Sequence, residues 1–271
     1  MLLTNWLNTL TSRIKKRPTF RSRDRRAIRR RWQTIFNNQI STAEVLEDRT
    51  LLTTYFVDDD YTGATDFTGT DTDPVAVGDQ NAVFGVTAFA TIEEAVDKVN
   101  VTADPAGATI LVAAGTYTPT LTMTISASVT IQGPQAGVDP RPGSGSLRDE
   151  TDPTTEAIID GSGALSRIFL IDANNVTLDG LVITNGTGDL VRSSNPVNQV
   201  IVQNNIIHNS SGDEGVQLAN ASNSTIQYNY IFDTEGDGAN LDTATNSSIR
   251  FNEMNNIRST NAAIFVDDSE G

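Results

Sequence analysis

The sequence predicts an all-β solenoid, a coil in which each turn is a rung of three short strands. Three observations predict it. A repeat of 23 to 24 residues is visible, the apolar runs after residue 108 are short and bounded by Gly, Asn or Pro, and hydrophobic residues are only 38% of the 271 residues. A chain with few apolar residues needs them at regular positions to form a core. Stacked rungs provide such positions.

The repeat appears in four segments that align without gaps: VTLDGLVITN (176–185), VIVQNNIIHN (200–209), STIQYNYIFD (224–233) and SSIRFNEMNN (247–256). One apolar position is filled by Leu178, Val202, Ile226 and Ile249, at spacings of 24, 24 and 23 residues. A second, five residues further on, is filled by Ile183, Ile207, Ile231 and Met254. A third strand follows each of the last three copies, at 215–221, 238–244 and 262–268.

One copy is a single rung and cannot bury its apolar face alone, so the copies must stack and pair through parallel ladders. Asn205, Asn229 and Asn252 recur at the bend between the first two strands. Asn tolerates the left-handed backbone region, and its amide can bond the equivalent Asn of the next rung. A leucine-rich repeat has a similar period, but its Leu frame and helical limb are not visible.

These features resemble the right-handed parallel β-helix of the pectate-lyase-like superfamily. The resemblance covers about residues 89–271 and extends to the segments TIEEAVDKV (91–99), ATILVAAGTYT (108–118), VTIQGP (129–134) and AIIDGSG (157–163). It implies a coil whose open end is capped by a short N-terminal helix.

That helix is expected over residues 91–100. Its apolar residues Ile92, Ala95, Val96 and Val99 have helical spacing, and Thr91 and Glu94 form a capping box. Beyond it, Ile131 and Leu178 are 47 residues apart, which is one rung plus a loop. The Pro/Gly-rich stretch 134–156 is that loop, and such loops project from a scaffold and often line binding grooves.

Charge divides the chain into unlike parts. Residues 1–54 form a basic leader: residues 1–50 hold 12 of the 19 Lys and Arg and 4 of the 34 Asp and Glu, a net charge of +8 against −23 for the rest. We expect a disordered, solvated leader rather than a nucleic-acid-binding arm, and no nucleic-acid partner, because the acidic remainder repels phosphates. An acidic Thr/Asp/Gly-rich segment follows over 55–88, with a short strand and a loop, before the coil at 89–271.

The segment AEVLEDRTLL (43–52) resembles the Leu-Glu-x-Arg-x-Leu-Leu element found near the front of many secreted or surface proteins of some bacteria. This resemblance implies an export role for the leader and an extracellular or cell-surface location. No window reaches the roughly 20 apolar residues of a transmembrane segment. The chain has no Cys, which excludes disulfides, thiolate zinc sites and Cys nucleophiles.

The single histidine, His208, argues against a multi-His metal site and a Ser-His-Asp triad. It follows the inward Ile207, so we expect it to point outward and to be solvated or hydrogen-bonded. Four aromatic residues offer faces for sugar rings or half-buried packing: Tyr228, Tyr230, Phe232 and Phe251.

An acidic column is predicted at Asp189, Asp213 and Asp237, which are spaced 24 and 24 residues apart. Stacked carboxylates about 5 Å apart repel each other unless a cation screens them, so this edge is a candidate Ca²⁺ site. The other interpretation, which we favour, is that Gly-Asp is a turn dipeptide leading into a strand.

The family resemblance also implies two kinds of catalysis. Hydrolases of this fold use clustered Asp residues, for which Asp213, Asp237 and Asp242 are candidates, although the Gly-Asp-Asp and Gly-His-Gly signatures of the polygalacturonase branch are missing. Lyases neutralise a uronate carboxylate and abstract the adjacent proton with Arg or Lys. Arg192, close to Asp189 in the sequence, is the best-placed candidate.

The sequence therefore predicts a secreted or cell-surface β-helix module with a structural or carbohydrate-contacting role and a polysaccharide or cell-wall partner. The alternative is a polysaccharide lyase or glycoside hydrolase that acts on an acidic polysaccharide, with or without Ca²⁺. The last residues, AAIFVDDSEG, run into a strand with no closing helix. We expect either a truncated reading frame or an end that meets another chain.

Overall fold

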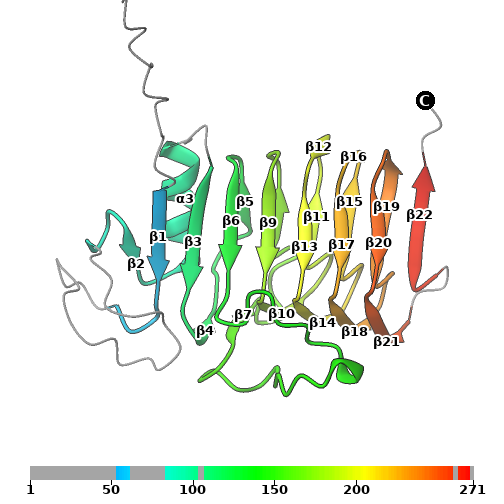
Figure 1. Ribbon diagram of the computed structural model, residues 1–271, viewed down its shortest axis with the longest axis horizontal. Helices are drawn as coiled ribbons and strands as arrows, with labels where there is room; N and C mark the ends of the chain where they lie inside the picture. The colour runs from blue at the N-terminus through cyan, green and yellow to red at the C-terminus, as the bar shows by residue number, and fades with distance from the viewer. Residues whose placement is uncertain (1–52, 62–82, 103–106, 259–261, 269–271) are drawn as a thin grey trace, which may run out of the picture. The chain divides into compact units, whose positions relative to one another are not determined.

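Three parallel sheets wind around a common apolar interior to form a β-solenoid of about six turns (Figure 1). The computed structural model describes residues 53–61, 83–102, 107–258 and 262–268. The basic leader, the element at 43–52 and most of the Thr/Asp/Gly-rich segment lie outside these residues. In the part of the chain that the structure describes, no helix is long and apolar enough to cross a membrane.

The first sheet contains eight strands. In order of pairing they are β2 (Ala88–Phe89), β1 (Thr53–Val57), β3 (Ala108–Val112), β6 (Val129–Gln132), β9 (Val176–Asp179), β13 (Ile201–Gln203), β17 (Thr225–Gln227) and β20 (Ser248–Arg250). β1 pairs along its whole length with β3. The boundary predicted at residue 89 therefore does not separate this early strand from the coil.

The second and third sheets contain six strands each. The second is β4 (Gly115–Tyr117), β7 (Ala157–Asp160), β10 (Val182–Gly186), β14 (Ile206–Ser210), β18 (Tyr230–Thr234) and β21 (Glu253–Ile257). The third is β5 (Met123–Ile125), β8 (Phe169–Ile171), β11 (Val191–Ser193), β15 (Val216–Ala219), β19 (Ala239–Ala244) and β22 (Ile264–Asp268). A small two-stranded sheet joins β12 (Val197–Asn198) to β16 (Ala221–Ser222).

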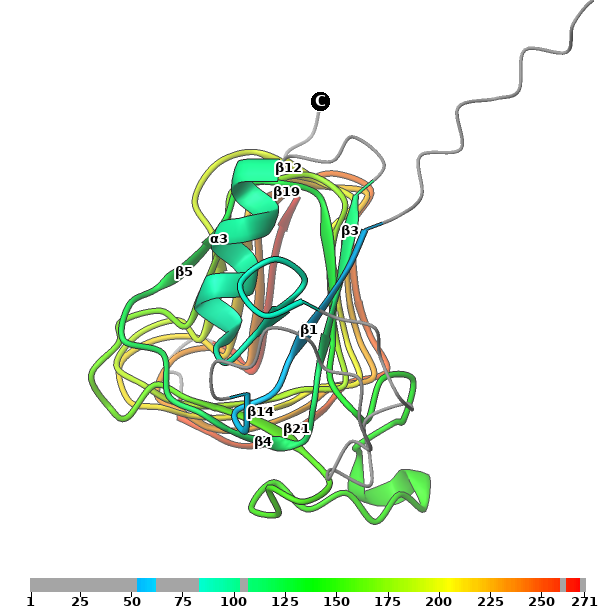
Figure 2. The ribbon, with the colours of Figure 1, turned by 90° about the vertical axis from the view of Figure 1, so that its left-hand side faces the viewer.

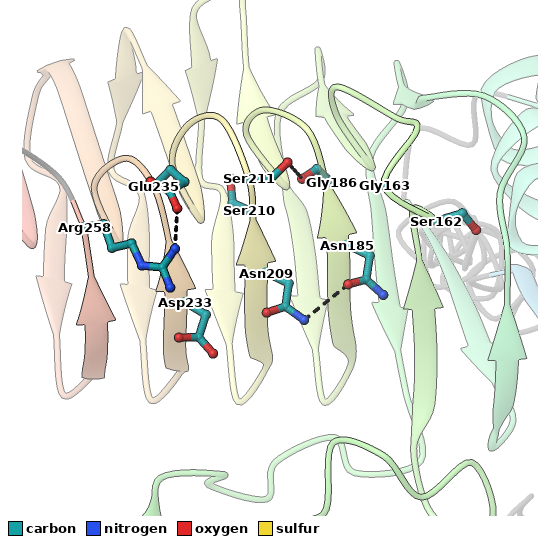
Figure 3. Close-up of a pocket in the computed structure, with 10 residues that line it drawn as sticks. All are labelled: Ser162, Gly163, Asn185, Gly186, Asn209, Ser210, Ser211, Asp233, Glu235 and Arg258. Carbon is teal, nitrogen blue, oxygen red and sulfur yellow. Dashed lines mark hydrogen bonds and ion pairs between the residues drawn. The ribbon is translucent and has the colours of Figure 1, made fainter.

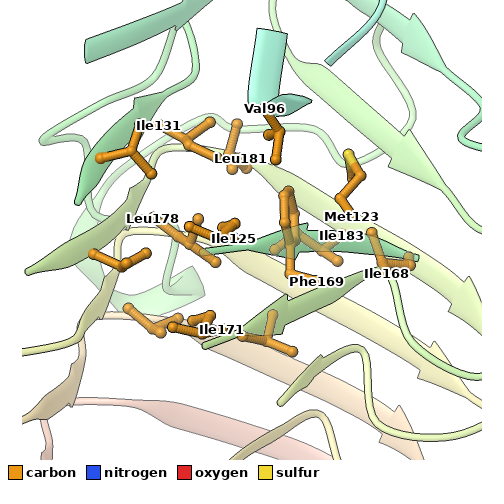
Figure 4. Packing of buried hydrophobic residues seen from close by; sticks show 14 of the residues in the cluster. Val96, Met123, Ile125, Ile131, Ile168, Phe169, Ile171, Leu178, Leu181 and Ile183 are labelled. Atoms are coloured by element: carbon orange, nitrogen blue, oxygen red, sulfur yellow. The ribbon is translucent and has the colours of Figure 1, made fainter. Parts of the chain in front are cut away.

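The predicted apolar columns are confirmed by the strand register. Val202 pairs with Leu178 on one side and with Ile226 on the other, and Ile226 pairs with Ile249. The second column, Ile183 to Met254, is paired in the same way. These side chains point into the coil, where they form one continuous core (Figure 4).

The predicted helix is also confirmed. α3 (Ile92–Thr102) begins after Thr91, whose Oγ1 accepts a hydrogen bond from the Glu94 backbone N–H at 3.2 Å. Its buried residues are Ile92, Ala95, Val96 and Val99. The helix lies across the first turn, against β1, β3 and β5, so it covers the apolar end of the coil (Figure 2).

The predicted asparagine ladder is present at the bend between the first and second sheets. Asn229 Nδ2 donates to the Val202 carbonyl and to Asn252 Oδ1, while Asn229 Oδ1 accepts from the backbone and side chain of Asn205. Its backbone conformation was predicted wrongly. The left-handed residue is the one before each ladder Asn, because that residue turns the chain while the Asn itself packs inside. These residues are Asn204, Tyr228 and Phe251, with φ of 54°, 53° and 55°.

The loop 134–156 fits the predicted insertion, since Ile131 and Leu178 pair directly across it. It contains a short 3-10 helix, η1 (Pro142–Ser144), and runs along the coil past β10, β14 and β18 (Figure 1). Arg148 anchors it through a salt bridge of 2.7 Å to Glu156, with both side chains almost fully buried. Arg148 also donates to the Asn204 carbonyl, so the loop is tied to a later rung.

A second apolar cluster covers the outer face of the second sheet. It consists of Ile158, Val182 and Ile206, with Tyr230 and Phe232 packed against them. His208 points outward as expected but is buried rather than solvated, with 8% of its surface exposed, and its ring stacks on Phe232 at 4.7 Å. Burial lowers the pKa of His208.

Candidate functional sites

Strand pairing changes the predicted acidic column. Val191 pairs with Val216, and Val216 pairs with Ala239, so the residues two places earlier are Asp189, Glu214 and Asp237. The even spacing of 24 had placed Asp213 in the middle. The bend between β14 and β15 has one residue more than the bends before β11 and β19, and this shifts Glu214 into the column.

The extra residue brings three carboxyl groups together. Oxygen atoms of Asp189, Asp213 and Glu214 all lie within 4.8 Å of one another. We call these three residues the carboxylate cluster. Asp189 is almost fully buried, with 2% of its surface exposed, so like charges face each other with little solvent between them.

The cluster strongly favours a proton on Glu214. Burial, followed by the hydrogen bonds to the Asp189 and Asp213 carboxyl groups, raises the pKa of Glu214 to about 9. A carboxyl group that keeps its proton at neutral pH can donate a hydrogen bond or act as an acid. It can also exchange that proton for a metal cation.

Two arginines neutralise the most buried member of the cluster. Arg192 Nη1 donates to Asp189 Oδ2 at 2.7 Å, and Arg167 Nε lies 3.9 Å from the same oxygen. The sequence predicted that Arg192 lies near Asp189, whereas Arg167, which precedes β8, was not connected with the site.

Several buried polar atoms around the cluster have no hydrogen-bond partner in the described residues. Besides Asp189 Oδ1 and Glu214 Oε2, they include Gln217 Oε1 and Asn240 Oδ1 on the next two strands of the third sheet. Asn240 Nδ2 donates to Glu214 Oε1 at 3.3 Å, so its amide belongs to the same surface. Carboxylate and amide oxygens are the ligands that Ca²⁺ prefers, and this set is of that chemical type.

The remaining candidates lie outside the cluster. Asp237 is buried in the next rung, where its backbone carbonyl accepts from Gly215 at 3.0 Å. Asp242 pairs with Ala219 on β15, roughly 16 Å farther along the strand than Asp237. The structure therefore brings Asp189, Asp213 and Arg192 together and does not bring Asp242 to them. Any catalytic or metal-binding role for these residues stays a prediction.

A second site is a polar groove of about 610 Å³ at the bends that lead from the second sheet to the third (Figure 3). We call it the polar groove. Its lining residues come from five consecutive rungs: Ser162, Gly163, Asn185, Gly186, Asn209, Ser210, Ser211, Asp233, Glu235 and Arg258. None of the four aromatic residues singled out in the sequence lines it.

The floor of the groove is a column of side chains, one from each rung. Asn185, Asn209 and Asp233 have left-handed backbones with φ of 60°, 58° and 53°. Asn209 Nδ2 donates to Asn185 Oδ1 at 3.2 Å, and Asn185 Nδ2 donates to Asp160 Oδ1 at 2.9 Å. At the other end, Asn256 donates to Asp233.

Sequence reasoning missed this column, although a signal was present. Asn185, Asn209, Asp233 and Asn256 each follow the inward aliphatic residue of the second strand by two positions, and they keep its spacings of 24, 24 and 23. Polar residues that repeat with the rung were considered only at the other bends.

The aromatic candidates form pairs elsewhere. Tyr228 stacks on Phe251 at 5.1 Å at the bend between the first and second sheets, and the Arg141 guanidinium lies 5.4 Å from the Tyr228 ring. Tyr230 and Phe232 are packed against each other on the second sheet. They are half-buried, as the second interpretation expected, except that 56% of Phe251 is exposed.

Comparison with known proteins agrees with the coil. The family model described as "Right handed beta helix region" matches residues 158–271. No curated protein matches the chain by sequence.

Two similar solved structures are of the pectin methylesterase from Aspergillus niger. The deglycosylated form is 16% identical with a TM-score of 0.32, and the alignment covers 76% of this chain and 71% of that one. A form that keeps an N-acetylglucosamine stub is 15% identical with a TM-score of 0.29, at the same coverage. The description of the coil rests on its own strand pairing and on the family match.

Proposed function

We propose that this chain is a carbohydrate-contacting module and that a polysaccharide lies in the polar groove, along the axis of the coil. The observation that carries the proposal is the column Asn185, Asn209 and Asp233, which presents hydrogen-bonding groups in a line on the floor of an open groove. Sugar hydroxyls both donate and accept hydrogen bonds, and amides and carboxylates complement them.

The spacing of the column supports an extended ligand. Successive rungs of a parallel sheet are about 4.8 Å apart, close to the length of one sugar unit in an extended chain. Ser162 and Arg258 lie at opposite ends of the groove in Figure 3, so several units fit along it. A structural role without a ligand would not require a polar column in an open groove.

The location that fits this function is outside the cell or on its surface, where polysaccharides are accessible. Support comes from the basic leader and from the resemblance of residues 43–52 to an export-associated element. Fractionation of cells that express the full chain, followed by detection of the protein in medium, surface and cytoplasmic fractions, tests the location.

Binding is tested by isothermal titration of the full chain with neutral and charged oligosaccharides of four to eight units. The double variant Asn185→Gly and Asn209→Gly removes both amides, and glycine keeps the left-handed backbone without strain. We expect at least about a tenfold loss of affinity, which corresponds to 1.4 kcal/mol.

The matched control is the double variant Gln199→Gly and Asn223→Gly. These two residues are also left-handed and occupy another bend of the coil, outside the groove. If the control loses as much affinity as the groove variant, or if no oligosaccharide binds the wild type, the proposal is wrong.

A second candidate function is acid–base catalysis on a polysaccharide at the carboxylate cluster. The observation that favours it is the raised pKa of Glu214, since a protonated carboxyl group within 4.8 Å of ionised ones gives an acid and a base in one place. Carboxyl groups about 5 Å apart are typical of glycosidases that retain configuration. The cluster's oxygens also allow a Ca²⁺-dependent variant of this chemistry.

The assay is incubation with a panel of polysaccharides, with and without Ca²⁺, in which new reducing ends and the absorbance of unsaturated products are measured. Activity that Glu214→Gln abolishes and Asp242→Asn leaves unchanged would support catalysis at the cluster. Silence of the wild type on the whole panel would leave the binding function as the only one of the two.

A further inference from the structure

The polar groove has an excess of hydrogen-bond acceptors. The amide nitrogens of Asn185 and Asn209 already donate along the column, to Asp160 and to Asn185 respectively. Asp233 contributes two further acceptor oxygens and no donor. A ligand that brings many donors therefore fits the groove floor better than one that brings acceptors.

The charges of the groove point the same way. Arg258 is the one cation among the residues that line the groove, and its Nη1 is bound to Glu235 Oε1 at 2.6 Å. Asp233, and Asp160 at the far end of the column, have no cationic partner among the printed ion pairs of the described residues. The groove is left with two uncompensated negative charges.

The rest of the coil offers little to an anionic polysaccharide. No lysine follows Lys98 in the sequence. In the described residues, five arginines face a carboxylate: Arg141, Arg148, Arg167, Arg192 and Arg258. The sixth, Arg250, donates to Gln227 at 2.9 Å. With a net charge of −23 after residue 50, the chain repels uronate polymers and attracts cations.

We infer that the glycan of the polar groove carries ammonium groups, as in a polymer of amino sugars without acetyl groups. This inference rests on the proposed function, and it specifies the ligand of the same groove. An ammonium group has three donors and no acceptor, so it satisfies Asp233 or Asp160 while sugar hydroxyls contact the amides between them.

The test compares oligosaccharides of one length and linkage that differ in charge: glucosamine hexamer, N-acetylglucosamine hexamer and, as an anionic probe, galacturonate hexamer. Affinities of the full chain are measured by isothermal titration at pH 6, in 0.05 M and 0.5 M NaCl. We expect the glucosamine hexamer to bind at least about tenfold more tightly than the acetylated one, and salt to narrow this difference. The galacturonate hexamer should bind most weakly.

Two variants locate the charge effect. Asp233→Asn keeps a hydrogen-bonding side chain and removes one groove charge, so it should remove most of the preference for glucosamine while leaving the affinity for the acetylated hexamer unchanged. Asp242→Asn makes the same change of net charge outside the groove and should leave the preference intact. Circular dichroism confirms that both variants are folded.

The outcomes separate this inference from the proposed function. Equal binding of the glucosamine and acetylated hexamers, both weakened by the Asn185 and Asn209 variant, would overturn the inference and keep the groove as a sugar site. Equal loss of preference in Asp233→Asn and Asp242→Asn would also overturn it, because net charge alone would then attract the ligand. Binding of no hexamer would overturn the proposed function itself.

Discussion

Glu214 is the residue whose surroundings depend most on the length of a single bend. One extra residue before β15 places its carboxyl group against Asp189 and Asp213. Its proton is then bound far more tightly in the folded chain than in the unfolded chain, which makes the stability of the coil dependent on pH.

The sign of this effect follows from the raised pKa. The ordinary value of 4.5 rises to about 9 in the folded chain, so the folded state binds more protons between these pH values. The stability contributed by this group is complete below pH 4.5 and is lost as pH rises toward 9. We predict that Glu214→Gln, which cannot ionise, is stabilised relative to wild type increasingly from pH 5 to pH 8.

Urea unfolding midpoints of both proteins at pH 5, 6, 7 and 8 check this prediction. The difference between the two proteins is the quantity to follow, because His208, whose pKa is lowered by burial, contributes a pH dependence of opposite sign to both. A constant difference across the pH range would show that Glu214 does not hold its proton in the folded chain.

Sequence reasoning identified Asp189, Asp213 and Arg192 as candidates but not Glu214 as their partner. A fixed period of 24 aligns letters, whereas strands align through their hydrogen bonds, and a bend absorbs an extra residue without disturbing either neighbouring strand. The sequence alone does not show which bend contains it.

At the scale of elements, the loop 134–156 is held by a buried ion pair. Arg148 and Glu156 are 2% and 0% exposed, and Arg148 also binds backbone carbonyls of the coil. Burial raises the pKa of Glu156 and the Arg148 guanidinium opposes that rise, so each charge depends on its partner.

We predict that Arg148→Met lowers the free energy of unfolding by about 3–5 kcal/mol, because it leaves the Glu156 carboxylate buried without a partner. The double variant Arg148→Met and Glu156→Gln should recover much of this loss. Urea unfolding measures both variants, with Arg250→Ala as the control for loss of an arginine at an exposed position. A loss below about 1 kcal/mol in the single variant would mean that the pair does not anchor the loop.

The elements themselves were predicted well where they repeat. The apolar columns, α3 with its cap at Thr91 and the ladder through Asn229 could all be read from spacing, because burial imposes the same residue types at each rung. The path of the loop could not be predicted. Its contacts, such as that of Arg148 with Asn204, are made once and leave no period in the sequence.

At the scale of the whole molecule, each rung contacts only its neighbours, so the coil should tolerate removal of one complete rung. Gln199 and Asn223 occupy equivalent positions, since Ile201 pairs with Thr225 and both preceding bends are left-handed. We predict that deletion of residues 200–223 gives a folded coil in which β17 pairs with β9.

Circular dichroism and cooperative thermal unfolding of the shortened chain check this prediction. Deletion of residues 200–219 is the control, because it removes a similar length but shifts the register and turns inward side chains outward. Equal folding or equal collapse of the two deletions would contradict the description of the rungs as interchangeable units.

The column of Asn185, Asn209 and Asp233 has a consequence for how a long chain would be held. A polymer displaced by one sugar unit meets nearly the same neighbours one rung further on, so many placements have similar energy. Affinity should then keep rising with polymer length after the groove is full, for statistical reasons alone. A bound chain could also slide from one placement to the next without ever leaving the surface.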